Sequence, residues 1–155
     1  MAKIVNCAVP IISELKQKNL IVQRVIDSNP LLEAFGNAKT FLNDNSSRFS
    51  RYSKLQFHVK DGVIHPMANI AGSICHTFLL EKSRVVTHDY NNERTFHIFY
   101  QLLAASEEEK CKIWKGLKGK TVSSFKYMGT GGIDEFTNRS AWKNTISALN
   151  TIGWF

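Results

Sequence analysis

The spacing of hydrophobic and polar residues predicts helices at the start of the chain. Apolar residues in segment 10–27 recur at helical spacing, which indicates one helix or a kinked pair of helices. Segment 28–36 has the features of a separate short helix, because a serine or asparagine can cap its start, Pro30 lies in its first turn and Gly36 ends it. The first segment, 10–27, is expected to serve mainly in packing.

A polar stretch and an extended stretch follow. Residues 37–47 include Asn43, Asp44 and Asn45 in a row, and this composition favours a loop because such side chains compete with regular backbone pairing. From Arg48 onward apolar and polar residues alternate, which predicts a strand. A later Asp-Gly pair is a hairpin signal, so an antiparallel hairpin is expected over about residues 48–80.

Three helices are predicted in the region of about 92–149. The first carries an apolar stripe at helical spacing that should lie in the core, formed by Phe96, Phe99, Tyr100 and Leu103. The second opens with a capping box, Ser106 to Glu109, and is expected to bury Cys111, Trp114 and Leu117. The last runs from Asp134 to about Leu149 with apolar residues along one side.

Composition favours one globular unit in the cytoplasm. The 155 residues are 43% apolar, which suffices for an ordinary core, and no apolar run approaches the roughly 20 residues of a membrane-spanning helix. The N-terminus lacks the basic and apolar parts of a secretory signal, and the three cysteines have neither disulfide-framework nor metal-site spacing. We therefore expect a cytoplasmic protein without a membrane span.

The net charge of +7 raises the alternative of a basic nucleic-acid-binding domain. The densest basic group consists of Lys110, Lys112, Lys115, Lys118 and Lys120. These lysines follow three glutamates at 107–109 on what reads as one helix, and this order complements the helix dipole. A solvated helix face is therefore favoured over a polyanion site, and no nucleic-acid partner is expected.

Other motifs with catalytic or metal-binding associations are incomplete. Residues 119–121, Gly-Lys-Thr, match the end of a phosphate-binding Walker loop, but Trp114 stands where that loop requires its first glycine. The five histidines never pair at helical metal-ligand spacing. No serine has the surroundings of a hydrolase nucleophile. A helix end with a basic tail is the favoured reading of residues 119–121.

The polar loop carries the chemistry that remains. Asn43, Ser46 and Ser47 bring small amide and hydroxyl groups beside the guanidinium of Arg48. Hydroxyls can ligate magnesium or bond phosphate oxygens, and an arginine can hold a carboxylate with two parallel hydrogen bonds. On chemistry alone, a turn with an ordinary surface arginine is slightly favoured.

Three ordered blocks of sequence resemble the myosin motor head. Residues 29–40 (NPLLEAFGNAKT) with 43–49 (NDNSSRF) are similar to its switch I region, so that the switch I loop would span 37–49. Residues 78–86 (FLLEKSRVV) and 93–103 (ERTFHIFYQLL) resemble two further blocks of the same head, in family order and at family-like spacing.

The resemblance implies a fold and a function. The fold would be α/β, part of a P-loop NTPase-type motor head, with helices flanking an antiparallel hairpin of the central sheet and upper-subdomain helices after it. The function would be that of a cytoskeletal motor that hydrolyses ATP with Mg and moves on actin. Its partners would be the remainder of the heavy chain and, mostly through regions outside this chain, the actin filament.

The resemblance also assigns residue roles. Asn43 would contact the nucleotide phosphates, and Ser46 would approach the γ-phosphate and help position the attacking water. Ser47 would ligate Mg, and Arg48 would hold a glutamate of switch II. Ser46 and Arg48 are thus the candidate catalytic residues, and these parts work by positioning and charge stabilisation.

Some features of the family are absent from the sequence. The glycine often found after the Arg-Phe pair is Ser50, and His65-Pro66-Met67 replaces a smoother return segment. No Walker loop precedes the switch-like loop and no D-x-x-G-[FY]-E segment follows it, which leaves Arg48 without a visible partner. We expect an N- and C-terminally truncated piece of a motor domain, over 1–155, that does not hydrolyse ATP alone. The alternatives are a non-catalytic interaction module derived from such a head and, last, the nucleic-acid-binding domain.

Overall fold

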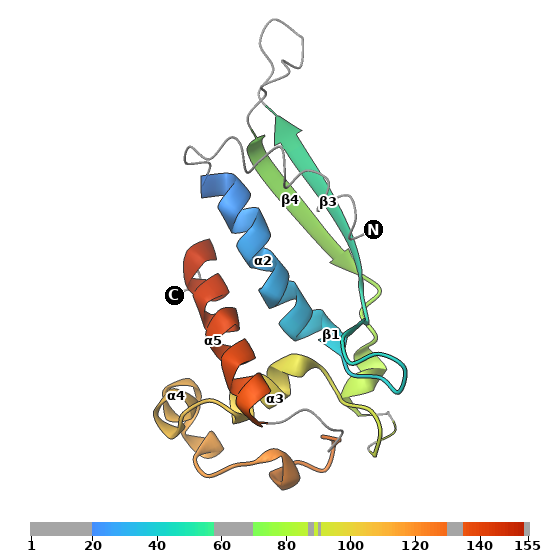
Figure 1. Ribbon diagram of the computed structural model, residues 1–155, viewed down its shortest axis with the longest axis vertical. Helices are drawn as coiled ribbons and strands as arrows, with labels where there is room; N and C mark the ends of the chain where they lie inside the picture. The colour runs from blue at the N-terminus through green and yellow to red at the C-terminus, as the bar shows by residue number, and fades with distance from the viewer. Residues whose placement is uncertain (1–19, 58–69, 87–88, 90, 130–134, 154–155) are drawn as a thin grey trace, which may run out of the picture.

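The computed structural model describes residues 20–57, 70–86, 89, 91–129 and 135–153 (Figure 1). The helices are α2 (Leu20–Gly36), α3 (His97–Leu103), α4 (Glu107–Ile113) and α5 (Glu135–Ile152), with short 3-10 turns η1 (Lys82–Val85), η2 (Lys115–Leu117) and η3 (Val122–Ser124). The strands are β1 (Asn37–Ala38), β2 (Ser46–Ser47), β3 (Ser50–Phe57) and β4 (Ile70–Phe78). The architecture is α/β, as predicted, with helices beside two antiparallel strand pairs.

Helix α2 is one continuous element, so the prediction of a separate helix beginning near Ser28 is wrong. Pro30 lies inside α2, and the Ser28 hydroxyl donates to the Val25 carbonyl oxygen at 2.7 Å instead of capping a helix start. An interior proline costs about 3 kcal/mol of helix stability, because it removes a backbone donor and crowds the preceding turn. Packing of the helix against α5 offsets this cost. The predicted helical residues 10–19 lie outside the described part of the chain.

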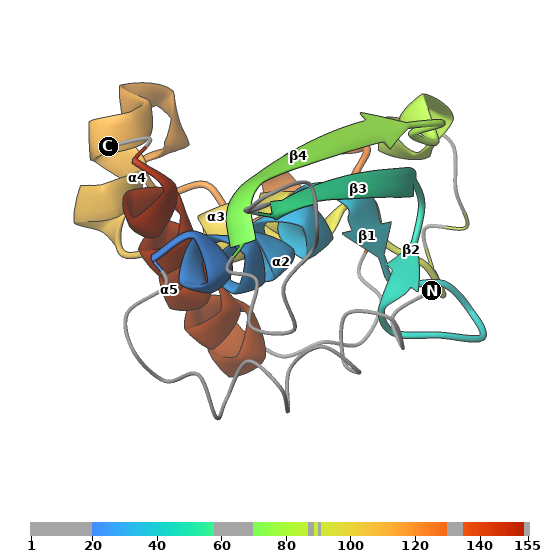
Figure 2. The same cartoon turned by 90° about the horizontal axis from the view of Figure 1, so that it is seen from above.

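The layers of the molecule meet along α2. Helix α5 runs beside one side of α2, and the β3–β4 pair lies along another side (Figures 1 and 2). The buried apolar side chains come from α2, α3, α5 and the segments between them: Val22, Ala34, Ala38, Phe96, Tyr100, Ala104, Ala105, Leu117, Met128, Trp142 and Ala148. A hydrogen bond of 2.8 Å from Thr145 Oγ1 of α5 to Gln101 Oε1 of α3 joins two helices inside this core.

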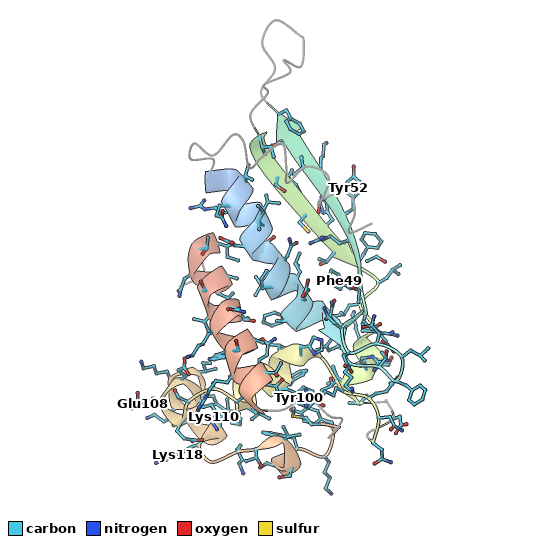
Figure 3. The ribbon with its side chains drawn as sticks, viewed as in Figure 1. Phe49, Tyr52, Tyr100, Glu108, Lys110 and Lys118 are labelled. Atoms are coloured by element: carbon cyan, nitrogen blue, oxygen red, sulfur yellow. The ribbon has the colours of Figure 1, made fainter. Side chains whose placement is uncertain are left out.

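Strands β3 and β4 form the predicted antiparallel pair. Their register runs from Ser50 opposite Phe78 to Phe57 opposite Ile70. Arg51 fixes β3 to α2, because its Nη1 donates to Asn29 Oδ1 at 2.8 Å. Large apolar side chains remain exposed on this pair: Tyr52 (labelled in Figure 3), Leu55, Phe57, Ile74 and Phe78. The Asp-Gly pair that predicted the turn lies outside the described residues.

The capping box of α4 is confirmed, but the helix is shorter than predicted. The Ser106 hydroxyl accepts from the Glu109 amide, and the Glu109 side chain accepts from the Ser106 amide. Trp114 is extended, with φ −159° and ψ 122°, and is 61% exposed, so the prediction that it is buried is wrong. The chain leaves the helix before Trp114 can turn inward, because the last helical residue is Ile113.

Lys110 is the exception to the expected solvated lysine group, because Lys112, Lys115, Lys118 and Lys120 are exposed. It is 4% exposed, and its Nζ lies 2.5 Å from Glu107 Oε1 and donates to the Lys120 carbonyl oxygen at 3.3 Å (Figure 3). The lysine therefore links α4 to the segment that follows η2. Within the described ranges, no helix is long and apolar enough to cross a membrane.

Candidate functional site

The polar stretch after α2 forms a closed loop of residues 37–48. Its ends pair as the two-residue strands β1 and β2, with Asn37 opposite Ser47 and Ala38 opposite Ser46. The Arg48 amide also donates to the Gly36 carbonyl oxygen at 2.8 Å. Sequence composition predicted only an irregular loop, because neither an Asn-Ala nor a Ser-Ser pair has strong strand propensity. The closed loop leaves the end of α2 and returns to the start of β3 (Figure 1).

The tip of the closed loop is stabilised by its own polar groups. Asn43 Oδ1 accepts from the Asn45 amide at 2.8 Å, which is an Asx turn, and the backbones of Thr40 and Asn43 exchange hydrogen bonds. Lys39 forms an ion pair with Asp44, and its hydrogen bond and charge hold the pKa of Asp44 below its usual range. Asn43 is exposed, and its Nδ2 has no hydrogen bond to the described residues. That amide group is available to a ligand oxygen.

Ser46 and Ser47 have different surroundings. Ser46 is half-buried, and its Oγ accepts from Arg48 Nη1 at 3.3 Å. Ser47 follows on the strand and is exposed, and its hydroxyl forms no hydrogen bond with the described residues. Successive strand residues point to opposite faces, which explains why the two side chains have different neighbours.

Arg48 has a partner inside the chain, contrary to the expectation from the sequence. Its Nε lies 2.5 Å from Glu81 Oε2, and the Glu81 amide donates to the Arg48 carbonyl oxygen at 2.9 Å. Arg84 Nε approaches the same carboxylate oxygen at 2.8 Å. Partial burial alone would raise the pKa of Glu81, but hydrogen bonds from Arg84 and Arg48 outweigh it and hold the pKa below its usual range.

The same ionic network reaches the other side of the closed loop. Arg84 is buried, and its Nη1 lies 3.0 Å from Glu93 Oε2. Glu93 Oε1 in turn accepts from the Phe41 amide at 3.3 Å. Glu81, Arg84 and Glu93 thus link the end of the closed loop, at Arg48, to Phe41 near its tip. No local sequence pattern marks these three residues as part of a site, although they lie in the blocks 78–86 and 93–103 that carry the family resemblance.

A second set of contacts joins the closed loop to α3. The Ala38 backbone bridges to Phe96, and the Arg94 amide donates to the Lys39 carbonyl oxygen at 3.0 Å. His97 Nε2 lies 3.1 Å from Asn45 Oδ1. Burial lowers the pKa of His97 to about 4, and the charge of Arg94 acts in the same direction. The imidazole is therefore neutral at pH 7.

The donor set of the closed loop fits part of a magnesium phosphate site. Asn43 Nδ2 and the hydroxyls of Ser46 and Ser47 can bond phosphate oxygens, and the free hydroxyl of Ser47 can act as one ligand of Mg²⁺. Among the described residues, no group of three or more His, Cys, Asp or Glu side chains could hold a metal ion.

The Walker-like residues 119–121 have no free phosphate cradle. Gly119 adopts φ +67°, a conformation that favours glycine, and its amide donates to Glu107 Oε2 at 2.8 Å. This amide is therefore already used by a carboxylate. The Thr121 amide donates to Ser124 Oγ at 3.1 Å in a 3-10 turn. The segment serves as a connection between α4 and η3.

Comparison with known proteins identifies the family. The family model described as myosin head (motor domain) matches residues 2–155. Myosin-52 of Schizosaccharomyces pombe is 39% identical over 143 residues, covering 90% of this chain and 9% of the relative. The myosin-J heavy chain of Dictyostelium discoideum is 40% identical over 136 residues, covering 86% and 6%. Unconventional myosin-Ic-A of Xenopus laevis is 43% identical over 141 residues, covering 89% and 13%.

The chain thus spans only about a tenth of the length of these curated relatives, but nearly all of it takes part in the match. The family model covers more than half of the chain and includes the closed loop, the ionic network and α3. The chain belongs to the myosin head (motor domain) family.

Proposed function

We propose that the chain supplies the switch I part of an ATP-driven, actin-based motor, and that the closed loop senses the γ-phosphate and magnesium. One observation carries the proposal: Ser47 presents an exposed hydroxyl with no hydrogen bond to the described residues, while the ionic network holds the loop at Arg48 and at Phe41. A turn that served only as a surface connection would not need two independent sets of contacts to fix its position.

Ser46 has a role that follows from its hydrogen bond. Because Ser46 Oγ already accepts from Arg48 Nη1, its hydroxyl hydrogen can be donated to a γ-phosphate oxygen or to the attacking water. Such a donor positions the reactants and stabilises charge, which is most of what phosphoryl transfer requires of a protein. Asn43 Nδ2 would donate to the nucleotide phosphates from the exposed tip of the loop.

Arg48 can serve two carboxylates. Its Nε is used by Glu81 and its Nη1 by Ser46. A guanidinium carries five N–H donors, so Nη2 remains for a glutamate of switch II. Ser47 would be the protein ligand that this chain gives to Mg²⁺, and the metal, when bound, would neutralise phosphate charge. In this arrangement Glu81 keeps Arg48 oriented before the switch II carboxylate arrives.

The remaining parts of the proposal concern the assembly. The exposed apolar side chains of β3 and β4 are surfaces that further elements of a motor head would cover, with the remainder of the heavy chain as the partner. Actin would be bound mostly by regions other than this chain. The expected location is cytoplasmic and cytoskeleton-associated, in keeping with the cytoskeletal motors of the family.

The test uses a chimeric motor. Unconventional myosin-Ic of Rattus norvegicus is 45% identical over 132 residues, and this matching segment can be replaced by that of the present chain. We expect the chimera to turn over MgATP with actin activation. Ser47→Ala should reduce turnover by about two orders of magnitude, because a lost ligand misplaces the phosphates. Ser53→Ala, which removes an exposed hydroxyl on β3, is the matched control and should change little.

Two results would contradict the proposal. One is a chimera that folds, as judged by its thermal unfolding, but has no nucleotide turnover. The other is unchanged turnover in the Ser47→Ala chimera, which would remove Ser47 as a metal ligand.

A further inference from the structure

The side chain of Asn45 lies where three elements meet. Its Oδ1 accepts from Asn37 Nδ2 of β1 at 2.9 Å and lies 3.1 Å from His97 Nε2 of α3. Its Nδ2 donates to Glu33 Oε2 of α2 at 3.4 Å. Asn45 immediately precedes Ser46, so these contacts fix the backbone directly before the two serines of the candidate site.

The contacts define which nitrogen of His97 carries its proton. Asn45 Nδ2 faces Glu33 Oε2, and Asn37 Nδ2 donates to Asn45 Oδ1, so the Asn45 carbonyl oxygen is the atom that lies toward His97. His97 Nε2 must therefore be a donor. Since the ring is neutral at pH 7, the contact selects the Nε2–H tautomer.

The position of His97 is itself well determined. It is the first residue of α3, and the preceding Phe96 is buried and bridged to Ala38. One turn later Tyr100 is fully buried (Figure 3), and its hydroxyl donates to the Gly129 carbonyl oxygen at 2.8 Å. Helix α3 is thus anchored in the core, and His97 at its start is held in a fixed position beside the closed loop.

We propose that His97 is a positioning residue of the closed loop, which donates Nε2–H to Asn45 Oδ1 and so fixes Ser46 and Ser47. The inference rests on the proposed function only for the role of the two serines in binding phosphate and magnesium. It gives the loop a second support, from α3, beside the ionic network that begins at Glu81.

The first experiment measures the tautomer in the unmodified 155-residue chain by long-range ¹H–¹⁵N NMR of the histidine rings at pH 7. We expect the Nε2–H form for His97, with a ring that stays neutral down to about pH 4. The exposed His76 of β4 is an internal reference. A proton on Nδ1 of His97 would overturn the proposal even if no variant could be made.

The second experiment compares amide hydrogen exchange of residues 45–48 in three variants. Without the imidazole donor, His97→Ala should raise exchange about tenfold, the equivalent of one lost hydrogen bond. His97→Gln retains an N–H donor and should keep exchange within about twofold of the unmodified chain. The matched control His76→Gln should have no effect. Circular dichroism confirms that each variant keeps its helices.

Unchanged exchange in His97→Ala would overturn the proposal, as would equal acceleration in the Ala and Gln variants. Neither experiment contains nucleotide, so both report on the closed loop alone. The outcome is therefore independent of the Ser47 test in the chimeric motor, and either hypothesis can fail without the other.

Discussion

At the scale of single residues, Glu81 is the point on which two arginines converge. Glu81→Gln keeps the shape of the side chain but replaces charge-assisted hydrogen bonds to Arg48 and Arg84 with neutral ones. We expect the free energy of unfolding to fall by about 1–2 kcal/mol, because the buried guanidinium of Arg84 also loses one of the negative charges that face it. Urea denaturation at pH 7 measures this change.

The matched control for this prediction is Glu108→Gln, at an exposed position of α4 (Figure 3). It should shift the denaturation midpoint far less, since surface charges contribute little. If both variants had the same midpoint, the ionic network at Glu81 would not stabilise the fold.

His97 predicts a pH dependence of stability. Its pKa is about 4 in the folded chain and about 6.5 when unfolded, so between these values the unfolded state binds more protons. Stability should therefore rise with pH across this window and be lost as pH falls through it. Arg94 opposes protonation and Asp44 favours it. Allowing for partial exposure, we expect a difference of about 1–2 kcal/mol.

The measurement is urea denaturation at several pH values between about 4.5 and 7.5. His97→Gln cannot titrate and should flatten the dependence across this range. A variant with the same slope as the unmodified chain would mean that other groups, such as carboxylates, cause the dependence.

At the scale of elements, Gly36 sets how closely α2 approaches the chain that leaves the closed loop. A Cβ at Gly36 would lie 2.3 Å from Phe49 Cδ1, whereas a Cβ at Gly72 would lie 2.5 Å from the terminal Oε1 of Gln56. The Phe49 ring lies against the end of α2, but the exposed Gln56 side chain can rotate away.

We therefore expect Gly36→Ala to destabilise the chain by about 1–3 kcal/mol, the usual cost of overpacking. Gly72→Ala, which has a similar nominal clash, should cost clearly less. Thermal unfolding of the two variants compares them directly, and an equal loss would mean that the Phe49 contact does not decide the effect.

The same scale explains which elements could be predicted from sequence. The β3–β4 pair and the α4 capping box were predictable because alternation and capping are local signals. The continuity of α2 through Pro30 was not, since packing against α5 overrides a local stop signal. Nor was the β1–β2 pairing, in which Ala38 pairs with Ser46 and Asn37 with Ser47 across a loop of weak strand propensity.

At the scale of the whole molecule, the serines and Arg48 could be selected from sequence through family resemblance, but their supports could not. Glu81 lies 33 positions from Arg48, and His97 lies 52 from Asn45. Neither spacing follows a helical or strand period, so only the folded chain brings these groups together. The closed loop thus depends on contacts from three separate parts of the chain, which are the end of α2, the segment around Glu81 and the start of α3.

The incomplete donor set gives a prediction for the isolated chain. Phosphate binding by the closed loop would rest on Asn43 and two hydroxyls, with a single protein ligand for Mg²⁺ at Ser47. These few contacts must offset the freedom lost on binding, which costs at least several kcal/mol. We expect a dissociation constant for MgATP above about 1 mM, measured by isothermal titration calorimetry. Ser47→Ala should then give the same weak signal. Micromolar affinity that disappears in Ser47→Ala would instead mean that this chain forms most of a nucleotide site by itself.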